Sequence, residues 1–474
     1  MAADEPFDPA VAGPGHARRS TGPVRKVLLV VYWLCLAGFL AYFWTSSQAR
    51  GASPLWIAYA CTVLACLAAA PRHAIVGPLV YVALAYGISS HAPELNIMLS
   101  IRLLDGVALL ALAAWLLSGR PPKPHNQSTA KPLVLAVLLF GWVAVCAAWA
   151  TANGAAWGSF LRHDPSAFLQ AGILFLVTAH VASTRRSTLA VAAVVVATVL
   201  GRALLQGTSG IHLESYVATL MVMGVPIAVL GAMATARTPV RYGFAAAGLV
   251  MAALIALTEN RAAAVAVAAA AAMVVWQLRG HRLGRAVVGV LVVAAGVAAF
   301  VPSTYLQRFT ALVDPELTHQ GARLDRKTVS ERVQIWSAGW DMARDHPVLG
   351  VGPGNYPATL GIYLPRKLPM AAHSSYVQMA AETGFVGLTL YLLFFAAVTR
   401  LSGMDRHHAD AAWRRRAGKM LQLVLVAYLA GGAFNSRHDL VLAYLVAGWA
   451  LALCVTQPQI APRGVPANPR EEPV

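Results

Sequence analysis

Residues 350–393 read GVGPGNYPATLGIYLPRKLPMAAHSSYVQMAAETGFVGLTLYLL and join a glycine-rich polar loop to a long apolar run. The apolar run that begins near Ser375 is close to the ~20 residues that an α-helix needs to cross a bilayer. His373 stands immediately before this run. The stretch therefore predicts a membrane helix with a histidine at its N-terminal end.

Apolar runs of similar length recur along the whole chain, in which 58% of the residues are hydrophobic and only 12% are charged. No strand-like alternation indicates a barrel, so we expect an all-α, polytopic membrane helical bundle. The number of spans is about twelve to fourteen, because the runs around Pro71 are ambiguous. The expected spans are 27–44, 54–70, 74–90, 97–118, 132–150, 166–183, 187–207, 212–236, 240–258, 261–278, 286–301, 375–399, 420–436 and 439–456.

The basic residues behind the net charge of +17 lie mostly in the loops between these runs. With the N-terminus inside, most basic residues of the short loops fall on the cytoplasmic side, including the cluster between Arg400 and Lys419. This positive-inside bias predicts that both ends are cytoplasmic. The charge is therefore a topology signal, and we expect no nucleic-acid partner.

This topology divides the chain into tails, membrane helices and one large outer loop. A long ordered loop in a compact domain is usually functional, and we expect this periplasmic loop to be partly helical. The expected parts are a cytoplasmic tail at 1–26, a transmembrane bundle at 27–301, the periplasmic loop at 302–374, C-terminal transmembrane helices at 375–456 and a cytoplasmic tail at 457–474.

One helix is predicted inside the outer loop. Residues 328–331 have capping-box spacing, and Val333, Trp336 and Trp340 recur on one helical face. Pro347 should end this helix, since the residue before proline avoids the α region. We expect the tryptophan stripe to pack on the bundle rather than lie along the membrane interface.

Three glycines, Gly350, Gly352 and Gly354, follow the expected end of that helix. Their amides are able to bind a phosphate, as at other glycine-rich loops. A plain turn, which needs glycine for its backbone angles, is the commoner use.

His373 is the main candidate for acid–base chemistry. The ordinary pKa of histidine, about 6.5, suits a general base near neutral pH. The alternative is an interfacial histidine that only caps the following helix. No Asp-x-Asp, His-x-x-x-His, nucleotide loop or catalytic triad is present, so we expect neither a metal nor a cofactor.

Three arginines lie near the predicted outer ends of the spans: Arg202, Arg261 and Arg437. Ionisable groups at membrane depth are costly and are therefore functional candidates. The planar guanidinium binds two phosphate oxygens at once and stays protonated, which suits a pyrophosphate. The alternatives are ion pairs with Glu214 or Glu259 and, for Arg437, extension of the side chain to the interface.

The segment 332–392 resembles the O-antigen ligase and polymerase superfamily of bacterial envelope glycosyltransferases. Upstream, the string TENR ending at Arg261 is similar to the family's Thr-x-Ser-Arg string, with Asn260 in place of serine. The matching features in the segment are Arg332 with Trp336, the string DHPVLGVGPGN from Asp345, and HSSY from His373 followed by ETG from Glu382.

The resemblance implies an inner-membrane enzyme whose active site faces the periplasm. Such an enzyme moves glycan from undecaprenyl pyrophosphate to an acceptor hydroxyl in one inverting, metal-independent step, without a cofactor. His373 would be the general base. The residues that we expect to bind substrate are Arg202, Arg261, Arg332, Arg437 and Tyr376.

The superfamily divides by acceptor. We favour the ligase branch, with the lipid A core as acceptor, because one large periplasmic loop carries the helix, the glycine turn and His373. An O-antigen polymerase and a protein O-oligosaccharyltransferase remain alternatives within the superfamily. A transporter of lipid-linked sugars is an alternative from another class of protein. Membrane lipids are expected partners, and the oligomeric state stays open.

Overall fold

The computed structural model describes residues 23–49, 54–87, 99–118, 127–152, 164–208, 215–258, 260–277, 320–365, 367–403 and 411–455. Throughout these residues the regular secondary structure is helical, with no strand. The fold is an all-α, polytopic membrane bundle, as the apolar runs predict. Its elements are α1 (Pro23–Ala49), α2 (Pro54–Ala65), the short 3₁₀ helix η1 (Cys66–Ala69), α3 (Val76–Gly87), α5 (Leu99–Ser118), α6 (Gln127–Ala152), α8 (Asp164–Val181), α9 (Arg185–Thr208), α10 (Ser215–Ala234), α11 (Thr238–Leu257), α12 (Arg261–Gln277), α15 (Gln320–Asp345), α16 (Tyr356–Tyr363), α17 (Ser375–Ser402), α18 (Ala411–Gly432) and α19 (Val441–Val455).

Among the described helices, six are long and apolar enough to cross a membrane: α1, α6, α9, α10, α11 and α17. Six shorter apolar helical segments accompany them, in α2 with η1, α3, α5, α8, α12 and α19. The helix α18 begins at Ala411, before the run predicted from residue 420, because basic residues such as Arg414 and Lys419 are good helix formers. The predicted span 286–301 and the tail 457–474 lie outside the described residues.

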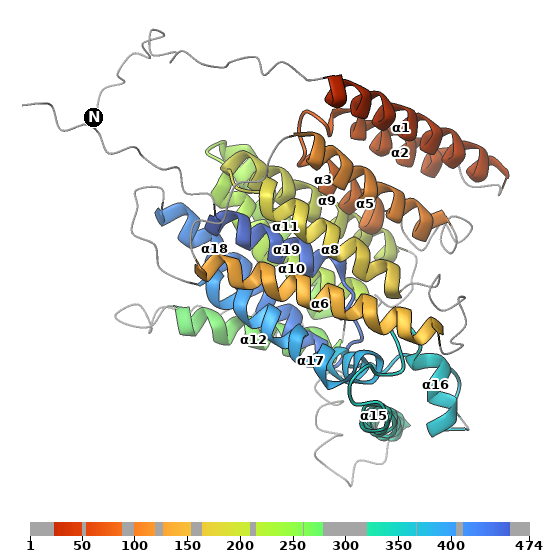
Figure 1. Ribbon diagram of the computed structural model, residues 1–474. Helices are drawn as coiled ribbons and strands as arrows, with labels where there is room; N and C mark the ends of the chain where they lie inside the picture. The colour runs from red at the N-terminus through yellow and green to blue at the C-terminus, as the bar shows by residue number, and fades with distance from the viewer. Residues whose placement is uncertain are drawn as a thin grey trace, which may run out of the picture.

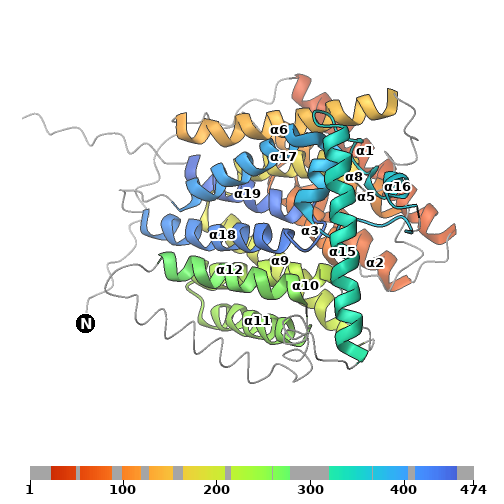
Figure 2. The same ribbon diagram turned by 90° about the horizontal axis from the view of Figure 1, so that it is seen from below.

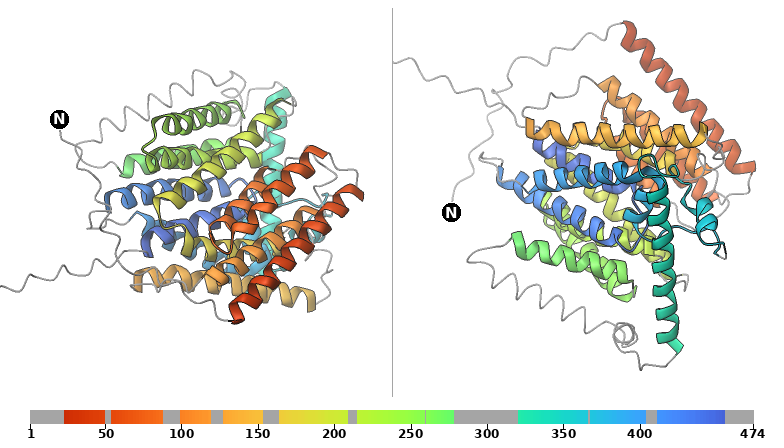
Figure 3. Two further views of the ribbon diagram at one scale, coloured as in Figure 1. Left: turned by 90° about the horizontal axis from the view of Figure 1, so that it is seen from above. Right: turned by 60° about the horizontal axis from the view of Figure 1, so that its bottom comes forward.

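The long helices run side by side through the bundle, with α1 and α2 on one flank (Figure 1). The helix α15 instead lies across the ends of its neighbours, as Figure 2 shows. In Figure 2 and in the right-hand view of Figure 3, α15 and α16 lie at the same end of the bundle. We call this end, where α17 also begins, the α15 end.

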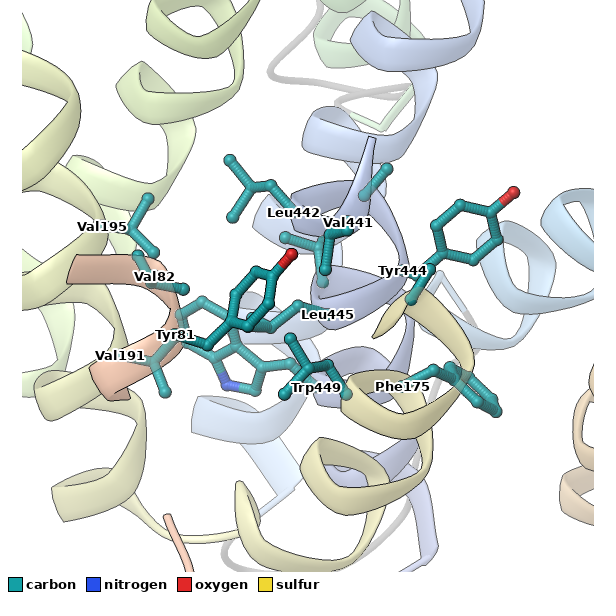
Figure 4. Packing of buried hydrophobic residues seen from close by; sticks show 14 of the residues in the cluster. Tyr81, Val82, Phe175, Val191, Val195, Val441, Leu442, Tyr444, Leu445 and Trp449 are labelled. Carbon is teal, nitrogen blue, oxygen red and sulfur yellow. The ribbon is translucent and has the colours of Figure 1, made fainter. Parts of the chain in front are cut away.

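The helix α19 forms the centre of the bundle. Every residue from 441 to 453 is buried, and α19 contacts α6, α8, α17 and α18. Figure 4 shows Leu445 and Trp449 of α19 packed toward Tyr81 of α3. A Cβ added at Gly448 would lie 2.4 Å from the Phe175 carbonyl oxygen, so only glycine permits this helix approach.

The helix predicted before His373 is present as α15, but it differs from the prediction at its start. It begins at Gln320, so the capping-box residues 328–331 lie inside it; residues 320–327 include good helix formers, and local spacing did not decide the start. It ends at Asp345, as the proline at 347 predicts. Trp336 donates to the Ala372 carbonyl at 2.8 Å, and Trp340 stacks on Phe385, so both tryptophans pack on the bundle as expected.

Candidate functional site

Two loops meet at the α15 end of the bundle. One precedes α17 and carries His373, and the other joins α18 to α19 and carries Arg437. The Ser374 amide donates to Ser436 Oγ at 3.2 Å, and the Arg437 amide donates to Ser375 Oγ at 2.9 Å. Because backbone groups of both loops take part, these bonds fix the two loops against each other.

The backbone of His373 is in the left-handed region, with φ 55°. Among the described residues it is the only non-glycine residue with positive φ. This conformation costs a non-glycine residue about 1–2 kcal/mol, and the surrounding contacts must hold it. The residue that caps α17 is Ser374, whose side chain accepts from the Val377 amide. Capping therefore does not require His373.

The ring of His373 is exposed enough to meet a ligand. Partial burial, followed by the nearby positive charges of Arg332 and Arg437, lowers the pKa of His373 below its ordinary value. A lowered pKa keeps the imidazole neutral at neutral pH, which is the state that accepts a proton. The structure thus brings His373, Arg332 and Arg437 together from three segments.

Arg202 and Arg437 both face the ring of Tyr216. Their guanidinium carbons lie 5.0 Å and 4.5 Å from the centroid of that ring, which is cation–π distance. The Nε atoms of both arginines are buried without a hydrogen-bond partner, and no carboxylate in the described part of the chain pairs with either side chain. Glu214 and Glu259, the acidic partners considered from the sequence, lie outside the described residues. Two arginines gathered in this way favour an anionic ligand.

Arg261 is the first residue of α12, and its side chain lies outside the described set. Asn260 caps the helix, because its Oδ1 accepts from the Ala262 amide at 2.9 Å. The following turns pack on α18, where Ala263 joins a buried cluster with Ala427. The sequence-predicted Arg261 therefore begins a helix at the side of α18, the helix that precedes the Arg437 loop.

Tyr376 is placed differently from the other predicted residues. Its hydroxyl donates to the Leu429 carbonyl of α18, and its ring contacts Tyr391 edge to face. The side chain thus links α17 to α18. Its predicted part in substrate binding stays a prediction.

The glycine loop contacts a kink in α17. Gly384 has φ 70° and interrupts the helix, which leaves the preceding carbonyl groups without their usual intrahelical partners. The Val351 amide donates to the Ala381 carbonyl at 2.8 Å, and the Gly352 amide to the Glu382 carbonyl at 3.0 Å. A Cβ at Gly384 would lie 2.1 Å from the Val348 carbonyl oxygen, so the contact requires glycine.

These bonds decide between a phosphate-binding loop and a plain turn, the two uses that the glycine pattern allows. Gly350, Gly352 and Gly354 all have positive φ, as a tight turn requires. Their amides donate within the protein, to the carbonyls of His346 and Glu382 and to the Glu382 carboxylate. The loop is a turn that binds α17, and its amides are not presented to a phosphate.

Two residues at the α15 end, Tyr216 and Asn435, carry no motif that singles them out in the sequence. Nor does the ETG string reveal that Glu382 meets His438. Asn435 donates to Thr219 Oγ1 at 3.1 Å, and His438 Nε2 lies 3.6 Å from Glu382 Oε2. Their partners are distant in the chain. One available signal was that Glu382 is an acidic residue within an apolar run, which is costly and needs partners.

Residues 246–392 match the family model described as O-antigen ligase. Arg261, Arg332, His373 and Tyr376 lie inside the matched segment, whereas Arg202 and Arg437 lie outside it. No curated protein matches the chain. Within the described residues, no group of three or more His, Cys, Asp or Glu side chains is placed to hold a metal ion.

Proposed function

We propose that this chain transfers O-antigen glycan from undecaprenyl pyrophosphate to a hydroxyl of the lipid A core, because residues 246–392 match the family model described as O-antigen ligase. The reaction would take place at the periplasmic face of the bacterial inner membrane. The observation that carries the proposal is the arrangement at the α15 end, where His373 lies near Arg332 and Arg437 while Arg202 and Arg437 flank Tyr216.

His373 is the proposed general base. The acceptor hydroxyl oxygen attacks the anomeric carbon of the donor sugar and forms the new glycosidic bond. The hydroxyl proton passes to the neutral imidazole, whose lowered pKa favours this state before the reaction. General-base catalysis of this kind typically contributes about 10²–10⁴-fold to the rate. A single displacement of this form inverts the anomeric centre.

The arginines are the proposed binding groups for the leaving pyrophosphate. As the anomeric carbon–oxygen bond breaks, its electron pair moves to the undecaprenyl pyrophosphate, whose negative charge grows. Arg202 and Arg437 have no acidic partner among the described residues and are available to bind this charge. Arg261, at the start of α12, is the third proposed ligand. Positive groups fixed in advance stabilise such charge without reorganisation.

We propose the ligase branch because of the large outer loop that carries α15 and His373. Arg332 and Trp336 lie on α15, which crosses the end of the bundle beside His373. An acceptor sugar attached to a lipid in the outer leaflet would reach this end of the bundle from the membrane surface. Arg332 would contact the acceptor or the donor glycan there.

The first test uses a bacterial host that lacks its own O-antigen ligase. The host receives the unaltered chain, a His373→Ala variant or a His346→Ala control, and its lipopolysaccharide is separated on a gel. His346 is an exposed histidine just after α15, so its removal changes a histidine at the same end. We expect a glycan ladder with the unaltered chain and with His346→Ala, and none with His373→Ala.

Membrane amounts of the three proteins are compared by immunoblot. A ladder that persists with His373→Ala contradicts the general base. If polymerised glycan accumulates on the lipid carrier only when the chain is present, and no glycan reaches the lipid A core, the polymerase branch replaces the ligase branch.

A further inference from the structure

The carboxylate of Glu382 is buried where the segments of the proposed site meet. Its side chain is 1% exposed and lies two residues before Gly384, where α17 is kinked. Its oxygens accept from the Gly354 amide at 3.0 Å, the Tyr356 amide at 3.4 Å and the Gln378 side-chain amide at 2.9 Å. A buried carboxylate is costly unless such partners satisfy it.

We propose that Glu382 is a positioning residue for the transfer reaction, which holds the loops of His373 and Arg437 and the helix of Arg332 in one fixed arrangement. The proposal rests on the proposed function. Glu382 does not touch the reacting atoms in it and acts only through its neighbours.

The link to His373 passes through Gln378. A carboxylate only accepts hydrogen bonds, so Glu382 must face the NH₂ group of Gln378. That orientation turns Gln378 Oε1 toward the Ala372 amide, at 3.4 Å. The Ala372 carbonyl accepts from Trp336 at 2.8 Å. The amide and the carbonyl of Ala372, the residue before His373, are thus both hydrogen-bonded. These bonds help to maintain the left-handed backbone of His373.

The link to Arg437 passes through His438. His438 Nε2 lies 3.6 Å from Glu382 Oε2, and both side chains are almost fully buried. The backbone around this pair is also held, because the Arg437 carbonyl accepts from Tyr428 and the His438 carbonyl from Tyr444, each at 2.8 Å. Glu382 therefore contacts the residue next to Arg437, the arginine that faces Tyr216.

The link to Arg332 passes through Tyr356. The Tyr356 amide contacts the carboxylate, and the Tyr356 hydroxyl donates to the Ile335 carbonyl of α15 at 2.7 Å. Ile335 lies one turn along the helix from Arg332. The charged groups that face His373, namely Arg332 and Arg437, are thus both connected to the same carboxylate.

The test compares three variants of the full-length protein in lipid nanodiscs. Glu382→Gln keeps the size of the side chain but lets the Gln378 amide rotate. Gln378→Met removes that amide and leaves Glu382 in place. Ser402→Ala is the matched control, because Ser402 is also buried in α17 and bonds only within the helix, to the Val398 carbonyl at 2.7 Å.

The first readout is transfer of glycan from a lipid-linked donor to purified lipid A core. We expect Glu382→Gln and Gln378→Met to lower kcat by roughly 10–100-fold, the scale of a displaced catalytic group, with KM for the donor within about threefold of the unaltered value. Ser402→Ala should leave kcat and KM unchanged. A kcat that falls only in proportion to the folded fraction would overturn the proposal.

The second readout does not require transfer. Diethyl pyrocarbonate modifies neutral histidine, so the pH midpoint of its reaction with His373, measured by mass spectrometry against His346, reports the surroundings of the ring. In Glu382→Gln we expect this midpoint to rise toward the ordinary value of about 6.5, because the ring leaves Arg332 and Arg437. An unchanged midpoint would overturn the proposal.

The two readouts separate the two claims. If the unaltered protein transfers no glycan, the proposed function fails, and the modification midpoint alone decides whether Glu382 positions His373. If Glu382→Gln does not fold, Gln378→Met decides in its place.

Discussion

Around α19 most of the side chains that meet are apolar, whereas the first turns of α17 are held by hydrogen bonds to loops from elsewhere in the chain. The core relies on close helix approach, as at Gly448, and on large buried rings such as Trp449. The α15 end instead contains a strained histidine, a buried carboxylate and two arginines, Arg202 and Arg437, whose Nε atoms are buried without a hydrogen-bond partner in the described residues.

This difference separates stability from function. A packed membrane core depends on shape, and its errors lower the free energy of unfolding. The α15 end depends on the placement of a few donors and charges, and the strain there is offset by contacts elsewhere. Substitutions in the two regions should therefore affect different measured quantities.

Apart from the loss of His373 itself, the largest effect is expected from the arginines that flank Tyr216. Arg437→Gln and Arg202→Gln should each lower the transfer rate by about 10²–10³-fold, because a fixed positive group is lost from the leaving pyrophosphate. Initial rates of the purified, reconstituted protein measure this effect. Arg344→Gln is the control, since Arg344 is an exposed arginine of α15 paired with Asp341 at 2.8 Å. Rates that fall equally in all three variants would contradict the assignment.

A smaller effect on a different quantity is expected in the core. Gly448→Ala places a Cβ 2.4 Å from the Phe175 carbonyl oxygen and should lower the free energy of unfolding by about 1–3 kcal/mol, the cost of overpacking. Thermal unfolding in detergent measures this loss. The transfer rate per folded molecule should stay unchanged, and Gly361→Ala, where nothing lies within 4 Å of the new Cβ, is the control. A Gly448→Ala protein of unchanged stability would show that the core is looser than described.

The smallest effect is expected in the pH dependence of transfer. Only neutral His373 accepts a proton, so the rate should rise with pH through the pKa of His373 and level off above it. Because burial and two arginines lower this pKa, the midpoint should lie below about 6.5. Arg332→Gln removes one positive charge and should move the midpoint upward. A midpoint at or above the ordinary value in the unaltered protein would be inconsistent with the described surroundings of His373.

The sequence predicted the all-α membrane fold, the end of α15 before Pro347 and the packing of its tryptophans. Each of these depends on composition or on a local signal. The start of α15 was predicted too late, because good helix formers extend the helix beyond the capping-box residues.

The arrangement of the site could be predicted only in part. His373 and the arginines stand out as ionisable groups beside apolar runs, but apolar helices carry little pattern that says which helix lies next to which. The meeting of Arg202 and Arg437 at Tyr216 joins α9, α10 and the loop before α19, and no local spacing encodes it. The contact of the glycine loop with α17 depends on the kink at Gly384, which a single glycine in an apolar run does not reveal.

The role of His373 is tested most directly by initial transfer rates of the unaltered protein, His373→Ala and His346→Ala, reconstituted with lipid-linked glycan and lipid A core. The account predicts a fall of about 10²–10⁴-fold for His373→Ala alone, with all three proteins unfolding at similar temperatures. Equal rates for the three proteins would contradict the account, because His373 would then not be the base.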